Sequence, residues 1–220
     1  MAGNSSSARP ASVPVITPGY WDDACKHLAR RDRVMRKLIP QFGQARLQSR
    51  GDAFTTLARS IVGQQISVKA AQSVWNRVLE VAPGMTPDDV LAVRRPRLRA
   101  CGLSDRKTEY IADLARHFAE GAVYPHRWPD MEDEAVIAEL VAVRGIGRWT
   151  AEMFLMFNLL RPDVYPLGDL GLLKAVRLTY FRGRDVPLSR IRRLGEQWAP
   201  WRSVATWYLW RSLDPLPVEY

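Results

Sequence analysis

Apolar residues recur every three or four positions along most of this chain, which is the spacing of amphipathic helices. After Ser67, for example, one helical face carries a run of apolar residues: Val68, Ala71, Val74, Trp75, Val78 and Leu79. No segment alternates apolar and polar residues between turn signals, as a half-buried strand would. The pattern therefore predicts an all-α fold. The expected helices lie at 18–29, 52–62, 67–79, 104–121, 136–141, 148–160, 170–181, 187–199 and 200–213, with a further one starting at Thr86.

Four polar residues stand at the starts of predicted helices and suit the N-cap position. They are Asp52, Ser67, Thr86 and Ser104. A side-chain oxygen at this position accepts a hydrogen bond from a backbone N–H that the first turn leaves unpaired. We therefore expect each of these residues to fix where its helix begins.

Composition narrows the class of protein. The 220 residues are 47% hydrophobic, which suffices for a buried core and argues against intrinsic disorder. No apolar run approaches the roughly 20 residues of a transmembrane helix, so we expect no membrane partner. Two cysteines cannot build a disulfide framework or a cluster held by four cysteines, and we expect no metal site made by side chains.

The net charge favours a polyanionic partner. Lys and Arg number 32 against 23 Asp and Glu, which gives a formal charge of +9. Such an excess is compatible with nucleic acid, although it concerns association and not fold. Residues 1–17 are rich in Ser, Ala and Pro and lack the apolar core of a secretory signal, so they are predicted to be a flexible tail. We expect an intracellular protein, cytoplasmic in a bacterium or nuclear in a eukaryote.

The segment around Arg144-Gly145-Ile146-Gly147 joins two predicted helices with almost no loop. Glycine permits the positive φ angles of such a reversal and lets another backbone approach closely. Ile146 can fill the groove between the helices, and the free N–H groups that start the second helix suit a phosphate oxygen. Arg148 adds positive charge nearby. An ordinary helical hairpin with a glycine C-cap is the alternative.

Five blocks of sequence together resemble the helix-hairpin-helix DNA glycosylase superfamily, and within it the 3-methyladenine DNA glycosylase II (AlkA-like) branch. They are Ser60–Ser67, Cys101–Ser104 with Lys107, Leu140–Phe157, Tyr165–Leu172, and Trp201–Ser203 with Trp210. The blocks follow the order of the family and span roughly residues 52–212. The chain departs from the larger members because it has no room for their extra β-rich N-terminal domain, so it is similar to the compact members.

The resemblance implies two helical lobes with a DNA-binding cleft between them. One lobe would comprise residues 52–160, including the hairpin at about 144–148. The other would combine residues 18–51 with 161–220. In the family, the aspartate that follows the Gly/Pro-rich loop acts at the reacting sugar, and here this is Asp169. Read without the family, Asp169 is a favourable helix N-cap.

The resemblance also assigns the residues that receive a flipped base. Trp149 and Trp210 would line the pocket, and Met153 stands where the family pattern has another aromatic residue. Core packing is the alternative for each Trp. Trp149 occupies the position at which bifunctional members carry a Schiff-base lysine, and an indole has no nucleophilic amine. We therefore expect a monofunctional enzyme that leaves an intact abasic site.

Two further DNA contacts follow from the resemblance. The Gln64-Gln65-Ile66 turn would insert a wedge into the gap left by the flipped base, with Gln65 where larger members have leucine. A polar helix C-terminus is the alternative for this turn. Lys107 is expected near the DNA backbone, and a solvated surface is equally compatible with its position.

The sequence thus predicts a monofunctional 3-methyladenine DNA glycosylase II of base excision repair. Its partner would be duplex DNA containing alkylated purines, and we expect a monomer. No cofactor is expected beyond a monovalent cation held by backbone carbonyls at the hairpin. The alternative is a non-catalytic helix-hairpin-helix DNA-binding module, which needs neither Asp169 nor a lined pocket.

Overall fold

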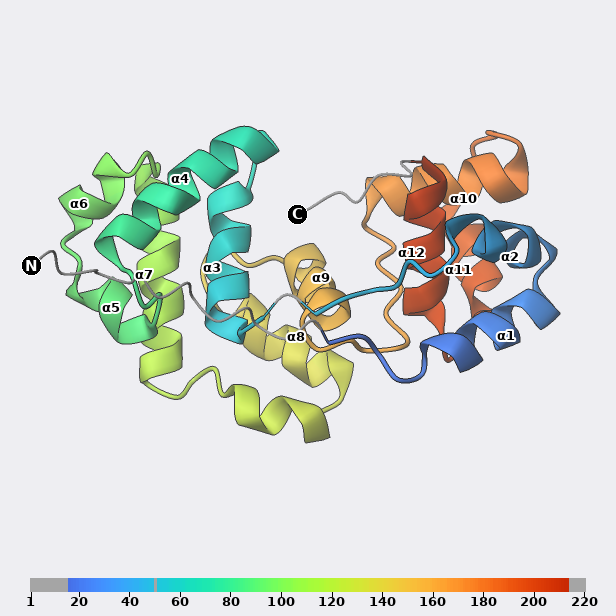
Figure 1. Ribbon diagram of the computed structural model, residues 1–220, viewed down its shortest axis with the longest axis horizontal. Helices are drawn as coiled ribbons and strands as arrows, with labels where there is room; N and C mark the ends of the chain where they lie inside the picture. The colour runs from blue at the N-terminus through green and yellow to red at the C-terminus, as the bar shows by residue number, and fades with distance from the viewer. Residues whose placement is uncertain (1–15, 50, 214–220) are drawn as a thin grey trace, which may run out of the picture.

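A computed structural model describes residues 16–49 and 51–213 (Figure 1). Every regular element in these ranges is helical, which confirms the all-α prediction. The helices are α1 (Trp21–Arg31), α2 (Arg33–Leu38), η1 (Ile39–Phe42), α3 (Ala53–Gly63), α4 (Val68–Val81), α5 (Pro87–Ala92), α6 (Arg95–Ala100), α7 (Asp105–Ala119), η2 (Pro125–Asp130), α8 (Asp133–Val141), α9 (Arg148–Phe157), α10 (Leu170–Phe181), α11 (Leu188–Glu196) and α12 (Arg202–Leu213). None of them is long and apolar enough to cross a lipid bilayer. Most of the predicted tail, 1–17, lies outside the described residues.

The four predicted N-caps are confirmed. Each side chain accepts a hydrogen bond from a backbone N–H of the first turn: Asp52 from Thr55, Ser67 from Ala70, Thr86 from Asp89 and Ser104 from Lys107. The helix predicted at 148–160 ends earlier, at Phe157. The next side chain, Asn158, donates to the carbonyl oxygen of Gly51 at 2.7 Å, and the chain then turns away. Helices α2 and α6 were not predicted, because six residues are too few to show a periodicity.

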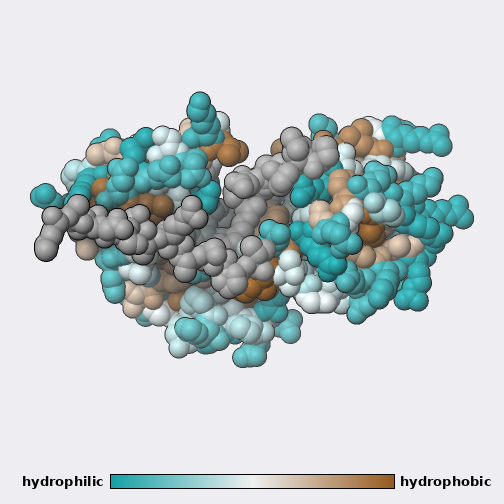
Figure 2. Space-filling view, in the orientation of Figure 1, coloured by the Kyte–Doolittle hydropathy of each residue, from teal (hydrophilic) through white to brown (hydrophobic). Residues whose placement is uncertain are grey.

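The buried apolar side chains form two separate cores, one in each lobe. Helices α3 to α9 enclose the first core, whereas α1 and α2 enclose the second together with α10, α11 and α12. Figure 1 shows the first lobe at the left and the second at the right, and hydrophilic residues cover most of the outer edge of the second lobe (Figure 2). Phe157 and Trp210 pack against both cores and therefore mark the junction between the lobes.

A buried carboxylate ties the second lobe together. Asp32 is only 4% exposed, and it caps α2 by accepting from two backbone N–H groups. Its Oδ2 also accepts from three side chains of the last third of the chain: Tyr180 at 2.7 Å, Trp198 at 2.8 Å and Gln197 at 3.1 Å. Because a buried carboxylate needs such partners, Asp32 fixes the corner between α1 and α2 against α10 and the end of α11.

Candidate functional site

Asp169 lies at the junction of the lobes, where it caps α10. Its Oδ1 accepts from the backbone N–H of Leu172 at 2.5 Å and from Trp210 Nε1 at 2.8 Å. Its Oδ2 accepts from Trp149 Nε1 at 2.9 Å. The cap and the site interpretations of Asp169 are therefore compatible. The same carboxylate starts a helix and meets the two tryptophans that were predicted beside it, each from a different helix.

The two tryptophans differ in how firmly they are held. Trp210 stacks on Phe157, with ring centroids 5.9 Å apart and planes inclined by 12°. Trp149 is 40% exposed, so much of its ring faces solvent although its N–H is bound. Phe157 was not predicted as a site residue, because an aromatic residue at the end of an apolar helix gives no signal beyond core packing. Met153 packs partly buried against the first core, and its role in a pocket stays a prediction.

The glycine hairpin contains one position at which only glycine fits. Gly145 has φ +88°, and a Cβ there would lie 2.2 Å from the Tyr110 ring. Ile146 is 4% exposed and packs into the first core, which confirms the predicted filling of the groove. Gly147 has an extended φ of −94°, so it does not need the positive angle. No side chain caps α9, and a Cβ placed at Gly147, its N-cap, would meet no other atom within 4 Å.

Arg148 contributes less free charge than expected. Its guanidinium donates twice to Glu134, at 2.9 and 2.5 Å, and its Nε donates to Glu152 Oε1 at 3.0 Å. The single positive charge of Arg148 is thus paired with two carboxyl groups, those of Glu134 and Glu152. Burial raises the pKa of Glu152, the charge of Arg148 opposes this shift, and the nearby Glu134 and Asp169 reinforce it. The expectation that Arg148 supplies positive charge to a phosphate stays a prediction, and such a contact would compete with this pairing.

In the turn between α3 and α4, the three predicted wedge residues do not share one orientation. Gln65 has φ +57°, and both Gln65 and Ile66 are exposed, as a wedge requires. Gln64 is directed the other way, and its Nε2 donates to the carbonyl oxygen of Gly145 at 2.9 Å. The Gln64 amide thus binds the hairpin, and its place in the wedge stays a prediction.

Lys107 also lies under this turn. Its Nζ donates to the carbonyl oxygen of Val62, in the last turn of α3, at 2.8 Å and to that of Gln64, the C-cap, at 2.7 Å. Burial lowers the pKa of this ammonium group. Two of its three N–H donors are thereby occupied inside the protein, and its expected contact with a DNA backbone stays a prediction. Within the described residues, no cluster of three His, Cys, Asp or Glu side chains is placed to hold a metal ion.

Residues 58–200 match a family described as HhH-GPD superfamily base excision DNA repair protein. A putative DNA-3-methyladenine glycosylase of Bacillus subtilis is 33% identical over 171 residues, which cover 73% of this chain and 59% of the relative. DNA-3-methyladenine glycosylase 1 of Schizosaccharomyces pombe is 29% identical over 193 residues, which cover 84% of this chain and 85% of that protein. The chain thus spans less than two thirds of the first relative and most of the second.

Solved structures agree with the same fold. DNA-3-methyladenine glycosidase from Bacillus halodurans superposes with a TM-score of 0.83 and 33% identity, covering 92% of this chain and 93% of that one. The 3-methyladenine DNA glycosylase of Schizosaccharomyces pombe, solved in complex with abasic DNA, has a TM-score of 0.72 and 28% identity. That match covers 89% of this chain and 100% of the yeast chain.

Proposed function

Because this chain belongs to the HhH-GPD superfamily of base excision DNA repair proteins, we propose that it is a DNA glycosylase that excises alkylated purines from duplex DNA. The observation that carries the proposal is the Asp169 carboxylate, which two indole N–H groups hold at the junction of the lobes. The names of the relatives, DNA-3-methyladenine glycosylases from bacteria and yeast, support the same class of substrate.

Asp169 would act on the sugar of an extruded nucleotide. Breaking the N-glycosidic bond builds positive charge on the deoxyribose, and a carboxylate beside C1′ stabilises that charge. The oxygen of a water molecule bonds to C1′ and loses its proton to Asp169 or to solvent, and the purine leaves with the electron pair of the broken bond. A purine methylated at N3 or N7 is cationic, so it departs as a neutral base without a strong general acid.

The aromatic groups around Asp169 suit such a base. A cationic, electron-poor ring is attracted to the electron-rich face of an indole. The exposed ring of Trp149 offers such a face, while Trp210 is fixed in place by its stack on Phe157. Met153 follows one turn after Trp149 on α9, where its flexible side chain would shape the pocket wall.

A non-catalytic DNA-binding module is the alternative, and a strand-cleavage assay separates the two. A duplex with one N7-methylated guanine is incubated with the protein and then treated with mild alkali, which cuts only at abasic sites. The proposal predicts a cut at the methylated position that requires both protein and alkali. Binding of the duplex without any alkali-dependent cut would favour the module.

We also propose that the enzyme lacks lyase activity, because Trp149 occupies the position beside the hairpin and carries no amine. Borohydride reduction during turnover is therefore expected to trap no covalent protein–DNA adduct. The assay needs a bifunctional glycosylase as its positive control. A trapped band with this protein would show that another residue forms a Schiff base, and monofunctional chemistry would then be rejected.

Gln65 is proposed to be the wedge that fills the space left by the extruded nucleotide. Its amide can support the orphaned partner base by a hydrogen bond, an interaction that exists only in a duplex. Gln65→Ala should therefore weaken binding to a duplex containing an abasic analogue by about ten-fold, with much less effect on the same single strand. Titrations of both substrates measure the difference. Equal losses on the two substrates would argue against the wedge.

The hairpin is proposed to bind one DNA phosphate. Its support is the uncapped first turn of α9 beside the open space at Gly147. A monovalent cation held by hairpin carbonyls would add positive charge there, although the Gly145 carbonyl already accepts from Gln64. We expect no other cofactor. We also expect a monomer, and sedimentation of the full chain measures this oligomeric state.

A further inference from the structure

The two loops proposed to contact DNA are bound to each other within the protein. The wedge loop (residues 64–66) and the hairpin (residues 144–148) lie about eighty positions apart in the sequence. The Gln64 side chain joins them directly, because its Nε2 donates to the Gly145 carbonyl at 2.9 Å. A surface loop of three residues has few contacts of its own, so such a link decides where it lies relative to the hairpin.

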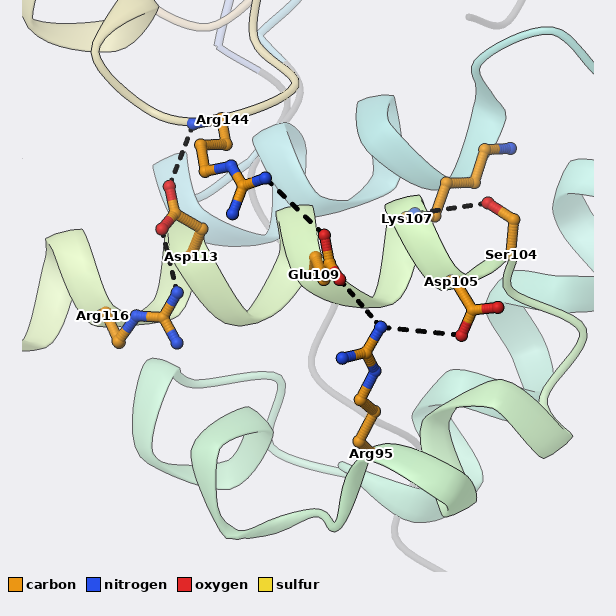
Figure 3. Close-up of polar contacts among 8 residues, drawn as sticks. All are labelled: Arg95, Ser104, Asp105, Lys107, Glu109, Asp113, Arg116 and Arg144. Atoms are coloured by element: carbon orange, nitrogen blue, oxygen red, sulfur yellow. Dashed lines mark hydrogen bonds and ion pairs between the residues drawn. The ribbon is translucent and has the colours of Figure 1, made fainter.

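Helix α7 supports both loops from below. Near its beginning, Lys107 binds the carbonyls of Val62 and Gln64 and so closes the end of α3. One turn further, the Tyr110 ring lies against Gly145. Asp113 then accepts from the backbone N–H of Arg144 at 3.0 Å. Figure 3 shows Lys107 and Asp113 on the same helix, with Arg144 of the hairpin above Asp113.

The polar groups of α7 are well suited to this supporting role. Burial by itself would raise the pKa of Asp113, but the hydrogen bonds from Arg144 and Arg116 and the charges of His117 and Arg116 outweigh it, so the pKa lies below its usual range. Glu109 adds ion pairs with Arg95 at 2.8 Å and with the Arg144 guanidinium at 3.7 Å. Hydrogen bonds that involve a charged group are stronger than neutral ones, so the Lys107 and Asp113 contacts hold the loops firmly, whereas the exposed ion pairs of Glu109 add little.

We propose that Gln64 and Lys107 are positioning residues that fix the distance between the wedge loop and the phosphate-binding hairpin. The wedge can then enter the base stack at one defined step. This inference rests on the proposed function. Successive phosphates on one strand are about 3.4 Å apart along the helix axis, so a wedge loop displaced by a few ångströms would meet the wrong step. Neither residue needs to touch DNA for this role.

Lys107→Met and Gln64→Met test the proposal, since each removes donors and keeps a side chain of similar length. The probe is a duplex with 2-aminopurine beside a stable abasic analogue, whose fluorescence changes when a wedge enters the stack. Both variants should bind this duplex about ten-fold more weakly than wild type and show a smaller fluorescence change at saturation. Their affinity for undamaged duplex and its salt dependence should stay unchanged. Lys107→Arg, which keeps charged donors, should recover part of the signal.

A matched control removes one positive charge from the same region but leaves the contacts of Lys107 with the carbonyls of Val62 and Gln64 in place. Lys69 is exposed in the first turn of α4, next to the same loop, and Lys69→Met should keep the full fluorescence change at saturation. Thermal melting confirms that each variant is folded. If Lys107 contacts a phosphate instead, Lys107→Met will lower the slope of log K against log salt by about one unit for every duplex, and this result would overturn the positioning role.

The remaining outcomes separate this inference from the proposed function. Variants that match wild type in fluorescence and affinity, while wild type releases methylated bases, would overturn the positioning role alone. A wild-type protein that produces no fluorescence change and releases no base would overturn the proposed function and this inference together.

Discussion

Asn in place of Asp169 is expected to leave the fold intact and to slow base release by about a thousandfold. Asparagine caps helices as well as aspartate does, so the hydrogen bond to Leu172 N can be kept. The amide cannot carry negative charge, however, and only one of its two polar atoms accepts hydrogen bonds. With the amide oxygen kept at the Oδ1 position, Leu172 N and Trp210 Nε1 retain their acceptor, whereas the indole N–H of Trp149 meets the amide nitrogen and loses its acceptor.

Single-turnover base release, with enzyme in excess over a methylated duplex, isolates this step from product release. Asp185→Asn is the matched control, because Asp185 is exposed and pairs with Arg177 at 2.8 Å. It makes the same chemical change and should release base at the wild-type rate. Asp169→Asn turnover within a few-fold of wild type would mean that the carboxylate only caps α10.

Asp32→Ala is expected to cost about 4 kcal/mol of stability, because it leaves several buried donors without an acceptor. Tyr180, Trp198 and Gln197 each donate to the oxygen that would be removed. For a chain of this length, that loss corresponds to a melting temperature lower by roughly 10 °C. Thermal or urea unfolding followed by circular dichroism measures it.

Asp23→Ala provides the comparison for this stability change. Asp23 lies in α1 and pairs with Lys26 at 3.4 Å, and both side chains are more than 70% exposed. Surface pairs of this kind contribute little, so the variant should melt close to wild type. If Asp32→Ala melted no lower than this control, the buried network would not be what holds the corner between α1 and α2 against α10 and the end of α11.

Local sequence signals predicted the helices and their starts. Asp52, Ser67, Thr86 and Ser104 were recognisable as caps because the interaction spans only three residues and depends on the side chain alone. Gly145 was recognisable because a reversal without a loop requires a positive φ angle. Asp169 was ambiguous from spacing alone, and it was the family resemblance that identified it as a site residue.

Contacts between distant parts of the chain were not predictable in the same way. Nothing near Gln64 in the sequence indicates that its amide binds Gly145, and nothing near Lys107 indicates that it binds the end of α3. Arg148 illustrates the same limit, because its pairing with Glu134 depends on how α8 packs against α9. A charged or polar residue in a loop looks available for a ligand until the fold brings a partner to it.

Chromatography of bases released from methylated duplex DNA tests the central claim most directly. The protein is expected to release 3-methyladenine or 7-methylguanine, to release no base from unmethylated duplex, and to lose the activity in Asp169→Asn. Undiminished release by Asp169→Asn would contradict the role of the carboxylate. Absence of any modified base with the folded wild-type protein would contradict the glycosylase itself.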